Sequence, residues 1–217
     1  HVATSNVPKD ISFISSVDAH LSWEIGNWIS NQHNLTSTKS IDMLKKKEKQ
    51  LYPVSEVFDI YKIPSYNKEH LTIPDNSDEV YDYITRTTTD RGICEKTGFI
   101  DSGGMNEAGT FSLGLLSMVF YYRENDWYAG QFMRKISCKY KIDRWTAIYL
   151  ETVLNGLSEK LLSGLVRDVD STFLDLKIEL PSKDGEIDFE WISNYVKSRE
   201  KQVIGDMIQA FTQEQED

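Results

Sequence analysis

The spacing of the apolar residues changes along this chain, and that change constrains the fold more than any other feature. In the segment 188–213 apolar residues recur every three or four positions, which is the period of an amphipathic helix. Between the two ends of the chain, strand-like alternation and closely spaced glycines are typical of short strands joined by tight turns. The same helical period occurs near the N-terminus, at Ile11, Ile14, Val17, Leu21, Ile25 and Trp28.

The sequence therefore predicts an α+β fold, in which a body of small mixed sheets is flanked by N- and C-terminal helices. We expect an N-terminal helical segment over 1–50, a body over 51–182 and a C-terminal docking or dimerisation helix over 183–217. Within the body a helix is expected to begin at the N-cap residue Asp143 and to break at Gly156. Strands are expected over 52–61, 79–89, 110–122 and 170–180, with Pro181 ending the last of them.

The charge is unevenly distributed. A net charge of −10 argues, at face value, against binding to nucleic acid. However, basic residues form two runs, over 45–49 and 134–144, whereas the chain from Asp184 onward holds nine acidic residues. A chain polarised in this way can bind a polyanion with one face, although ordinary solvated surface explains the two runs equally well.

The residues that carry catalysis or bind cofactors form no recognisable pattern. Cys94 and Cys138 are far apart and belong to no Cys-x-x-Cys pair, and the histidines are scattered, so we expect reduced thiols, no metal and no cofactor. The glycine-rich segment 102–109 lacks the Gly-Lys-Ser/Thr ending of a phosphate-binding loop. Reduced thiols, together with the lack of a long apolar run or a secretory signal, favour a cytoplasmic protein.

A nuclease centre is also weakly supported. Asp175-Leu176-Lys177 is the one acid-x-Lys sequence of the chain, and Asp168 and Asp170 lie just upstream. Alternating Asp and Lys are ordinary on the solvent-exposed face of a strand, and we expect that placement here. We therefore expect a chain without its own catalytic centre.

Four segments, in order, resemble the specificity subunits of type I restriction–modification systems and the related recognition subunits of type IIB and IIG enzymes. The resemblance runs over about 54–196, and its order and spacing are more specific than any one string. The segments are Val-Ser-Glu-Val-Phe-Asp-Ile at 54–60, Tyr-Ile-Thr-Arg-Thr-Thr-Thr-Asp-Arg-Gly-Ile at 83–93, Phe-Tyr-Tyr at 120–122 with Trp-Tyr-Ala-Gly at 127–130, and Ile-Glu-Leu-Pro at 178–181 with Gly185, Asp188 and 192–196 after it.

The sequence departs from the family at two points. Asp90-Arg91 stands where a pair of Asn is common, which puts any role of that pair in doubt. Members of the family usually carry two recognition domains joined by two long helices, whereas this chain carries one domain with a helix at each end. It therefore resembles a half-subunit or a piece of a larger fused enzyme.

The resemblance implies a target-recognition domain that binds a specific sequence of double-stranded DNA and directs a methyltransferase or nuclease partner to it. Arginine can form two hydrogen bonds to guanine, and threonine can contact a phosphate or a thymine methyl group. Alternation assigns Phe132, Met133 and Ile136 to the core. The expected DNA-binding residues are Arg86, Thr87, Thr88, Arg91, Asn106, Gln131, Arg134, Lys135, Lys139 and Lys141.

The C-terminal helix is expected to make a second contact. Its apolar stripe must be buried against something, and the body can cover only part of it. We expect a homodimer or a methyltransferase complex, with Val203, Met207 and Phe211 at the contact. The alternative is a protein- or carbohydrate-binding module without a DNA function, because the many Tyr and Trp residues could line a sugar-binding groove.

Overall fold

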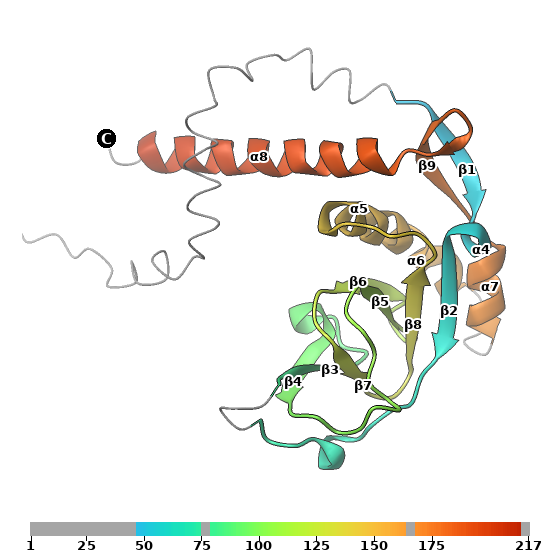
Figure 1. Cartoon of the computed structure of the whole chain (residues 1–217), viewed down its shortest axis with the longest axis vertical. Helices are drawn as coiled ribbons and strands as arrows, with labels where there is room; N and C mark the ends of the chain where they lie inside the picture. Colours follow the sequence, from blue (N-terminus) through green and yellow to red (C-terminus); the bar gives the residue numbers. More distant parts are fainter. Residues whose placement is uncertain (1–46, 75–78, 164–167, 214–217) are drawn as a thin grey trace, which may run out of the picture. The chain divides into compact units, whose positions relative to one another are not determined.

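The computed structural model describes residues 47–74, 79–163 and 168–213 (Figure 1). The N-terminal helix expected over 11–28 and the basic residues Lys45 and Lys46 lie outside these residues. The described residues contain both helices and small sheets, so the α+β fold class is confirmed. The division into three segments stays a prediction.

The largest sheet has four antiparallel strands in the order β2-β8-β5-β6. Strands β5 and β6 form a hairpin within the expected segment 110–122, and β8 pairs with both β2 and β5. The strands are β2 (Phe58–Lys62), β5 (Thr110–Gly114), β6 (Val119–Arg123) and β8 (Met133–Cys138).

A second sheet has the order β4-β3-β7. Strand β3 pairs antiparallel with β4 and parallel with β7, which places the ends of β3 and β7 side by side. The strand expected over 79–89 is shorter than predicted, because β3 ends at Ile84 and the polar, Thr-rich residues that follow are not part of it. The strands are β3 (Tyr81–Ile84), β4 (Ile93–Thr97) and β7 (Trp127–Ala129), with the short helices η2 (Lys68–His70) and η3 (Thr89–Gly92) before β3 and β4 respectively.

The third sheet has the order β1-β9-β10 and precedes the terminal helix. The prediction that Pro181 ends its strand is wrong, because β9 continues to Lys183. Proline is tolerated there because Pro181 lies opposite Lys49, the first residue of β1, where the ladder begins. The strands are β1 (Lys49–Pro53), β9 (Lys177–Lys183) and β10 (Glu186–Ile187).

Two short helices form in segments where strands were expected, within 52–61 and 170–180. Helix α4 (Val54–Val57) buries Val54 and Val57, and α7 (Val169–Asp175) buries Val169 and Phe173. Spacings of three and four residues place each pair on one helical face. Both segments are too short for their period to be distinguished from that of a strand.

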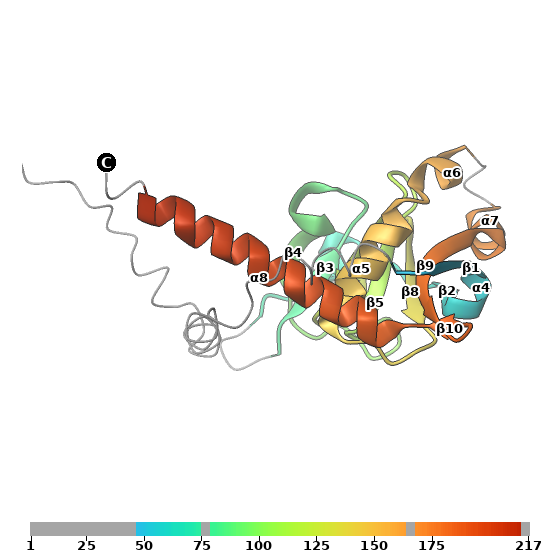
Figure 2. The same cartoon turned by 90° about the horizontal axis from the view of Figure 1, so that it is seen from above.

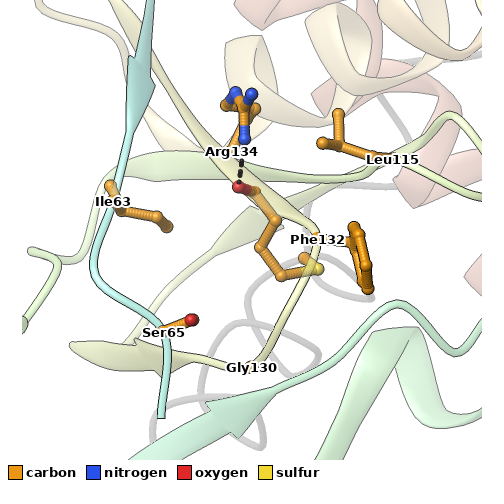
Figure 3. Close-up of a pocket in the computed structure, with 7 residues that line it drawn as sticks. Ile63, Ser65, Leu115, Gly130, Phe132 and Arg134 are labelled. Atoms are coloured by element: carbon orange, nitrogen blue, oxygen red, sulfur yellow. Dashed lines mark hydrogen bonds between the residues drawn. The ribbon is translucent and has the colours of Figure 1, made fainter. Parts of the chain in front are cut away.

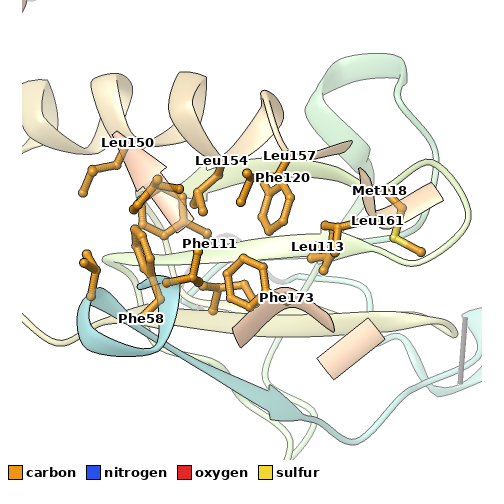
Figure 4. Packing of buried hydrophobic residues seen from close by; sticks show 14 of the residues in the cluster. Phe58, Phe111, Leu113, Met118, Phe120, Leu150, Leu154, Leu157, Leu161 and Phe173 are labelled. Atoms are coloured by element: carbon orange, nitrogen blue, oxygen red, sulfur yellow. The ribbon is translucent and has the colours of Figure 1, made fainter. Parts of the chain in front are cut away.

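The main core lies between the four-stranded sheet and the helices that cover it. Leu150 and Leu154 of α5 (Arg144–Asn155) pack towards Phe111 and Phe120 of the sheet, with Phe173 of α7 beside them (Figure 4). Helix α6 (Ser158–Leu162) adds a further buried leucine. The expected helix boundaries are confirmed, because Asp143 accepts a hydrogen bond from the backbone of Thr146 at 2.8 Å and Gly156 follows the last residue.

The terminal helix α8 (Phe189–Gln213) lies beside α5, as both views show (Figures 1 and 2). Ser193 of α8 donates a hydrogen bond to Asp143 at 2.5 Å, and Trp145 of α5 donates one to Glu200 at 2.8 Å. Lys197 lies 4.3 Å from the centre of the Trp145 ring. The first half of α8 is therefore attached to the body by polar and aromatic contacts.

Candidate nucleic-acid interface

Four loops from distant parts of the sequence meet at one edge of the body. Because β3 and β7 are parallel, the loops that follow them, 85–88 and 130–132, begin side by side, and Gly130 donates to the carbonyl of Ile84 at 2.7 Å. The β5–β6 turn joins them through a 2.9 Å hydrogen bond from Leu115 to Phe132. The loop after β2 joins them through a 2.8 Å bond from Tyr66 to Ala129.

These loops enclose two open depressions. One, of about 510 Å³, is mainly apolar, with Phe132 on one side and Ile63 on the other (Figure 3). The second, of about 790 Å³, is more polar. It is lined by Tyr66, Asn67, Lys68, Tyr83, Thr85, Arg86, Thr87, Thr88, Cys94, Leu116, Ser117 and Gln131.

Four of the expected DNA-binding residues gather in the larger depression: Arg86, Thr87, Thr88 and Gln131. All four are exposed. Gln131 donates a hydrogen bond to the side chain of Asn67 at 3.1 Å. Arg86 lies over the ring of Phe132, 5.3 Å from its centre. The structure thus brings together two groups of residues that are separated by more than forty positions in the sequence.

Arg91 lines neither depression. Asp90, Arg91 and Gly92 have positive φ angles of 46°, 52° and 82°, so the backbone turns sharply at the end of the loop. The guanidinium of Arg91 then forms hydrogen bonds of 2.8 and 3.1 Å to the carboxylate of Glu151 on α5. We therefore leave Arg91 out of the proposed contact surface.

A buried arginine that the sequence analysis did not identify supports the same loop. Arg123, which is 2% exposed, donates to the hydroxyl of Ser112 at 2.6 Å and to the carbonyl of Arg91 at 2.7 Å. Burial, with the nearby charge of Arg91, lowers the pKa of Arg123 to about 10. Arg123 therefore stays charged at neutral pH and holds the loop in place.

The basic residues of β8 and its continuation do not form one strip. Arg134 and Lys135 are adjacent in the strand, so they lie on opposite faces of the sheet. Three of the basic residues have an acidic partner: Arg134 lies 2.8 Å from Asp170, Lys135 lies 3.1 Å from Glu107 and Lys139 lies 3.2 Å from Asp59. Lys141 is exposed. These ion pairs reduce the charge that the residues can offer to a phosphate.

Two further expectations differ from the structure. Asn106 is 3% exposed, and its amide donates to the carbonyls of Gly104 and Trp127, both at 3.2 Å. It therefore organises the chain before β5, and we leave it out of the contact surface. The assignment of Phe132 to the core is wrong, because its side chain is 50% exposed, whereas Met133 and Ile136 are buried as expected.

The placement of the acidic residues bears on the nuclease alternative. Within them, no three His, Cys, Asp or Glu side chains are placed to hold a metal ion. Asp175 and Lys177 do not share one strand, because Asp175 ends α7 and Lys177 begins β9. Asp170 is paired with Arg134.

The distribution of aromatic residues also bears on the sugar-binding alternative. The large rings of Trp127, Tyr128, Tyr81 and Tyr83 are buried. Tyr81, Tyr83 and Tyr128 pack together in one buried cluster, and Trp127 packs in another with Ile84, Ala129 and Met133. Among the described helices none could span a membrane.

The apolar side of α8 is partly exposed beyond α5. Val203 is 51% exposed and Met207 is 54% exposed. Their four-residue spacing places them on one face of the helix. Phe211 lies in the same helix, and its side chain is outside the described part of the chain.

The fold and the site define an α+β module whose loops present polar and basic side chains at one edge of its sheets. The chain belongs to the type I restriction modification DNA specificity domain family, whose model matches residues 46–215. The resemblance inferred from the sequence is therefore confirmed. Comparison with curated proteins finds no match.

Two solved structures are similar in fold. One is an HsdS subunit from Thermoanaerobacter tengcongensis, with a TM-score of 0.51, 13% identity and coverage of 86% of this chain and 48% of that chain. The other comes from a study of complex assembly and conformational transition of the type I R-M system, with a TM-score of 0.51, 14% identity and coverage of 91% of this chain and 54% of that chain. This chain thus spans about half the length of the chains that it matches.

Proposed function

We propose that this chain recognises a short sequence of double-stranded DNA with the loops around Arg86, and that it directs a methyltransferase or nuclease partner to that sequence. Membership of the DNA specificity family supports this proposal. The concentration of exposed polar side chains in the loops at one edge of the sheets supports it as well. We assign the chain no bond chemistry of its own.

The observation that carries the proposal is that the guanidinium of Arg86 is not engaged by a protein acceptor in the described part of the chain. Of the arginines in the described ranges, Arg86 alone has no hydrogen bond or ion pair to a protein acceptor. Its guanidinium lies on an aromatic ring, which orients the group without using its N–H donors. A free, oriented guanidinium can donate to both O6 and N7 of guanine in the major groove.

The neighbouring side chains fit the same surface. The hydroxyls of Thr87 and Thr88 can contact phosphates or base edges, and the amide of Gln131 can pair with adenine. Binding costs Arg86 no existing ion pair, whereas Arg134, Lys135 and Lys139 would each have to leave a carboxylate. The loops around Arg86 are therefore the better contact surface.

The test is a selection of binding sites from random duplex DNA at defined salt, with the full chain alone and with a methyltransferase subunit. Arg86→Ala should relax one guanine position by roughly 1–3 kcal/mol, and Arg86→Lys should restore charge without restoring that preference. Arg144→Ala is the control, because Arg144 is an exposed arginine at the start of α5 that pairs with Glu124 and lines neither depression. Failure of the wild-type chain to enrich any sequence would refute the proposal.

The partner contact is proposed for the exposed face of α8 that carries Val203 and Met207, with Phe211 in the same helix. That partner is a methyltransferase subunit or a second copy of this chain. Either would cover apolar surface that the described part of the body leaves exposed.

A further inference from the structure

The aromatic ring of Phe132 is exposed to solvent, and the backbone of this residue has an unusual conformation. Its side chain is 50% exposed and its φ angle is +62°. The left-handed region is unfavourable for a bulky residue, and exposure of the ring adds a further cost. Outliers of this kind gather at binding sites, where the surrounding structure holds them in place.

The surrounding structure does fix this turn. The carbonyl of Phe132 accepts a 2.9 Å hydrogen bond from Leu115, and Gly130 donates a 2.7 Å bond to Ile84. Met133, the next residue, is buried in the second sheet's core. The turn is therefore anchored by three of its residues, and the ring is presented at a defined place in the lining of the smaller depression.

The ring also forms a unit with Arg86. The guanidinium carbon lies 5.3 Å from the centre of the Phe132 ring, and the two residues come from the loops after β3 and β7. The attraction acts through the face of the ring, so the edge of the guanidinium keeps its donors. The smaller depression, lined by Ile63, Leu115 and Met133, provides more apolar surface next to the ring (Figure 3).

We propose that Phe132 is a specificity-determining residue that packs against the 5-methyl group of a thymine, next to the guanine that Arg86 contacts. This inference rests on the proposed function. In the major groove the apolar methyl group distinguishes thymine from the other bases, and phenylalanine is one of the side chains that contact it. Base pairs are about 3.4 Å apart along the helix axis, so the two side chains are close enough to reach neighbouring pairs.

The experiment removes single methyl groups from the DNA. A duplex selected by the full chain is remade with uracil in place of each thymine in turn, and affinities are compared for the wild type and for Phe132→Asn. Asn tolerates a positive φ angle, so this variant removes the ring and keeps the turn. Phe99→Asn is the control, because Phe99 is 54% exposed and lines neither depression.

The wild type and Phe99→Asn should lose about fourfold in affinity when one particular thymine becomes uracil, as expected for one buried methyl group. Phe132→Asn should bind the two duplexes equally. The inference is overturned if no uracil substitution weakens the wild type, or if Phe132→Asn retains the same loss. A wild type that selects no sequence at all overturns the proposed function as well, which separates the two failures.

Discussion

The guanidinium of Arg91 and the carboxylate of Glu151 form a two-pronged ion pair that links the end of the β3–β4 loop to helix α5, with hydrogen bonds of 2.8 and 3.1 Å. Glu151 also accepts a 2.7 Å hydrogen bond from the backbone of Tyr122. Because α5 packs against α8, this ion pair connects the proposed DNA surface to the helix that is proposed to contact a partner. Arg91 is therefore a positioning residue in the proposed recognition.

Arg91→Ala should weaken binding to all DNA sequences by up to about fivefold and leave the selected sequence unchanged. The ion pair is partly exposed, so its loss should cost roughly 1 kcal/mol of loop anchoring. Competition binding against the selected duplex and its single-base variants measures both effects. A preference lost at one base position would make Arg91 a base contact.

Glu151→Gln separates loop anchoring from a phosphate contact. If Arg91 anchors the loop, this variant should weaken binding as Arg91→Ala does. If Arg91 contacts a phosphate, removal of the competing carboxylate should strengthen binding. The same competition assay distinguishes these opposite signs.

Gly92→Ala should reduce both stability and DNA binding. Gly92 has a φ angle of +82°, and an added Cβ would lie 3.0 Å from the carbonyl oxygen of Thr85 and 3.2 Å from that of Thr87. The left-handed backbone alone should cost roughly 1–2 kcal/mol. Gly185→Ala is the matched control, because Gly185 has a φ angle of +87° and no atom within 4 Å of an added Cβ.

Urea unfolding and DNA binding are measured for both glycine variants. Both should lose stability, and only Gly92→Ala should also lose affinity for the selected duplex, because its contacts lie in the Arg86 loop. Equal affinity for the two variants would show that the position of this loop does not matter for binding.

The elements that the sequence predicted well are the long periodic ones. The helices α5 and α8 repeat their apolar pattern over several turns, and Asp143, the predicted N-cap of α5, accepts the expected backbone hydrogen bond from Thr146. By contrast, α4 and α7 have four and seven residues, too few for their period to be recognised. Their assignment depended on burial against the four-stranded sheet, which is a tertiary effect.

The site was predictable only in part, for a related reason. The sequence pattern placed Arg86, Thr87 and Thr88 at the end of a strand expected over 79–89, next to a turn, whereas β3 ends at Ile84 and these residues lie on the loop after it. The position of Phe132 could not be predicted, because alternation fails where a positive φ angle turns the chain. Neither the pairing of Arg91 with Glu151 nor the burial of Arg123 has a local signal, since their partners lie 60 and 11 positions away.

Acid should weaken the contact between α5 and α8. Burial alone would raise the pKa of Asp143, but hydrogen bonds from Ser193 and Thr146 and the charge of Lys197 hold it below its ordinary value. The pKa of Asp188 is likewise lowered, against the effect of burial, chiefly by Lys47. A lowered carboxyl pKa stabilises the fold above the unfolded value of about 4, and this stability is lost as pH falls through the folded pKa.

Helix content by circular dichroism and urea unfolding, both followed from pH 7 to pH 2, measure this effect. The loss should be smaller in Asp143→Asn, because Asn keeps the N-cap hydrogen bond but does not titrate. Identical pH profiles for the wild type and this variant would exclude Asp143 as a contributor.

Met207→Asp should abolish association with a partner while leaving the body folded. Met207 is 54% exposed, and Val203, one turn earlier, is 51% exposed, so a charge here meets water in the isolated chain but an apolar surface in a complex. Burial of an unpaired carboxylate is strongly unfavourable, whereas surface substitutions usually change stability by less than about 0.5 kcal/mol.

Gln202→Asp is the control, because it adds the same charge on a different face of the exposed helix. Light scattering measures dimerisation, and co-purification measures binding to a methyltransferase subunit. If Met207→Asp associates as well as Gln202→Asp in both assays, this face of α8 is not the contact.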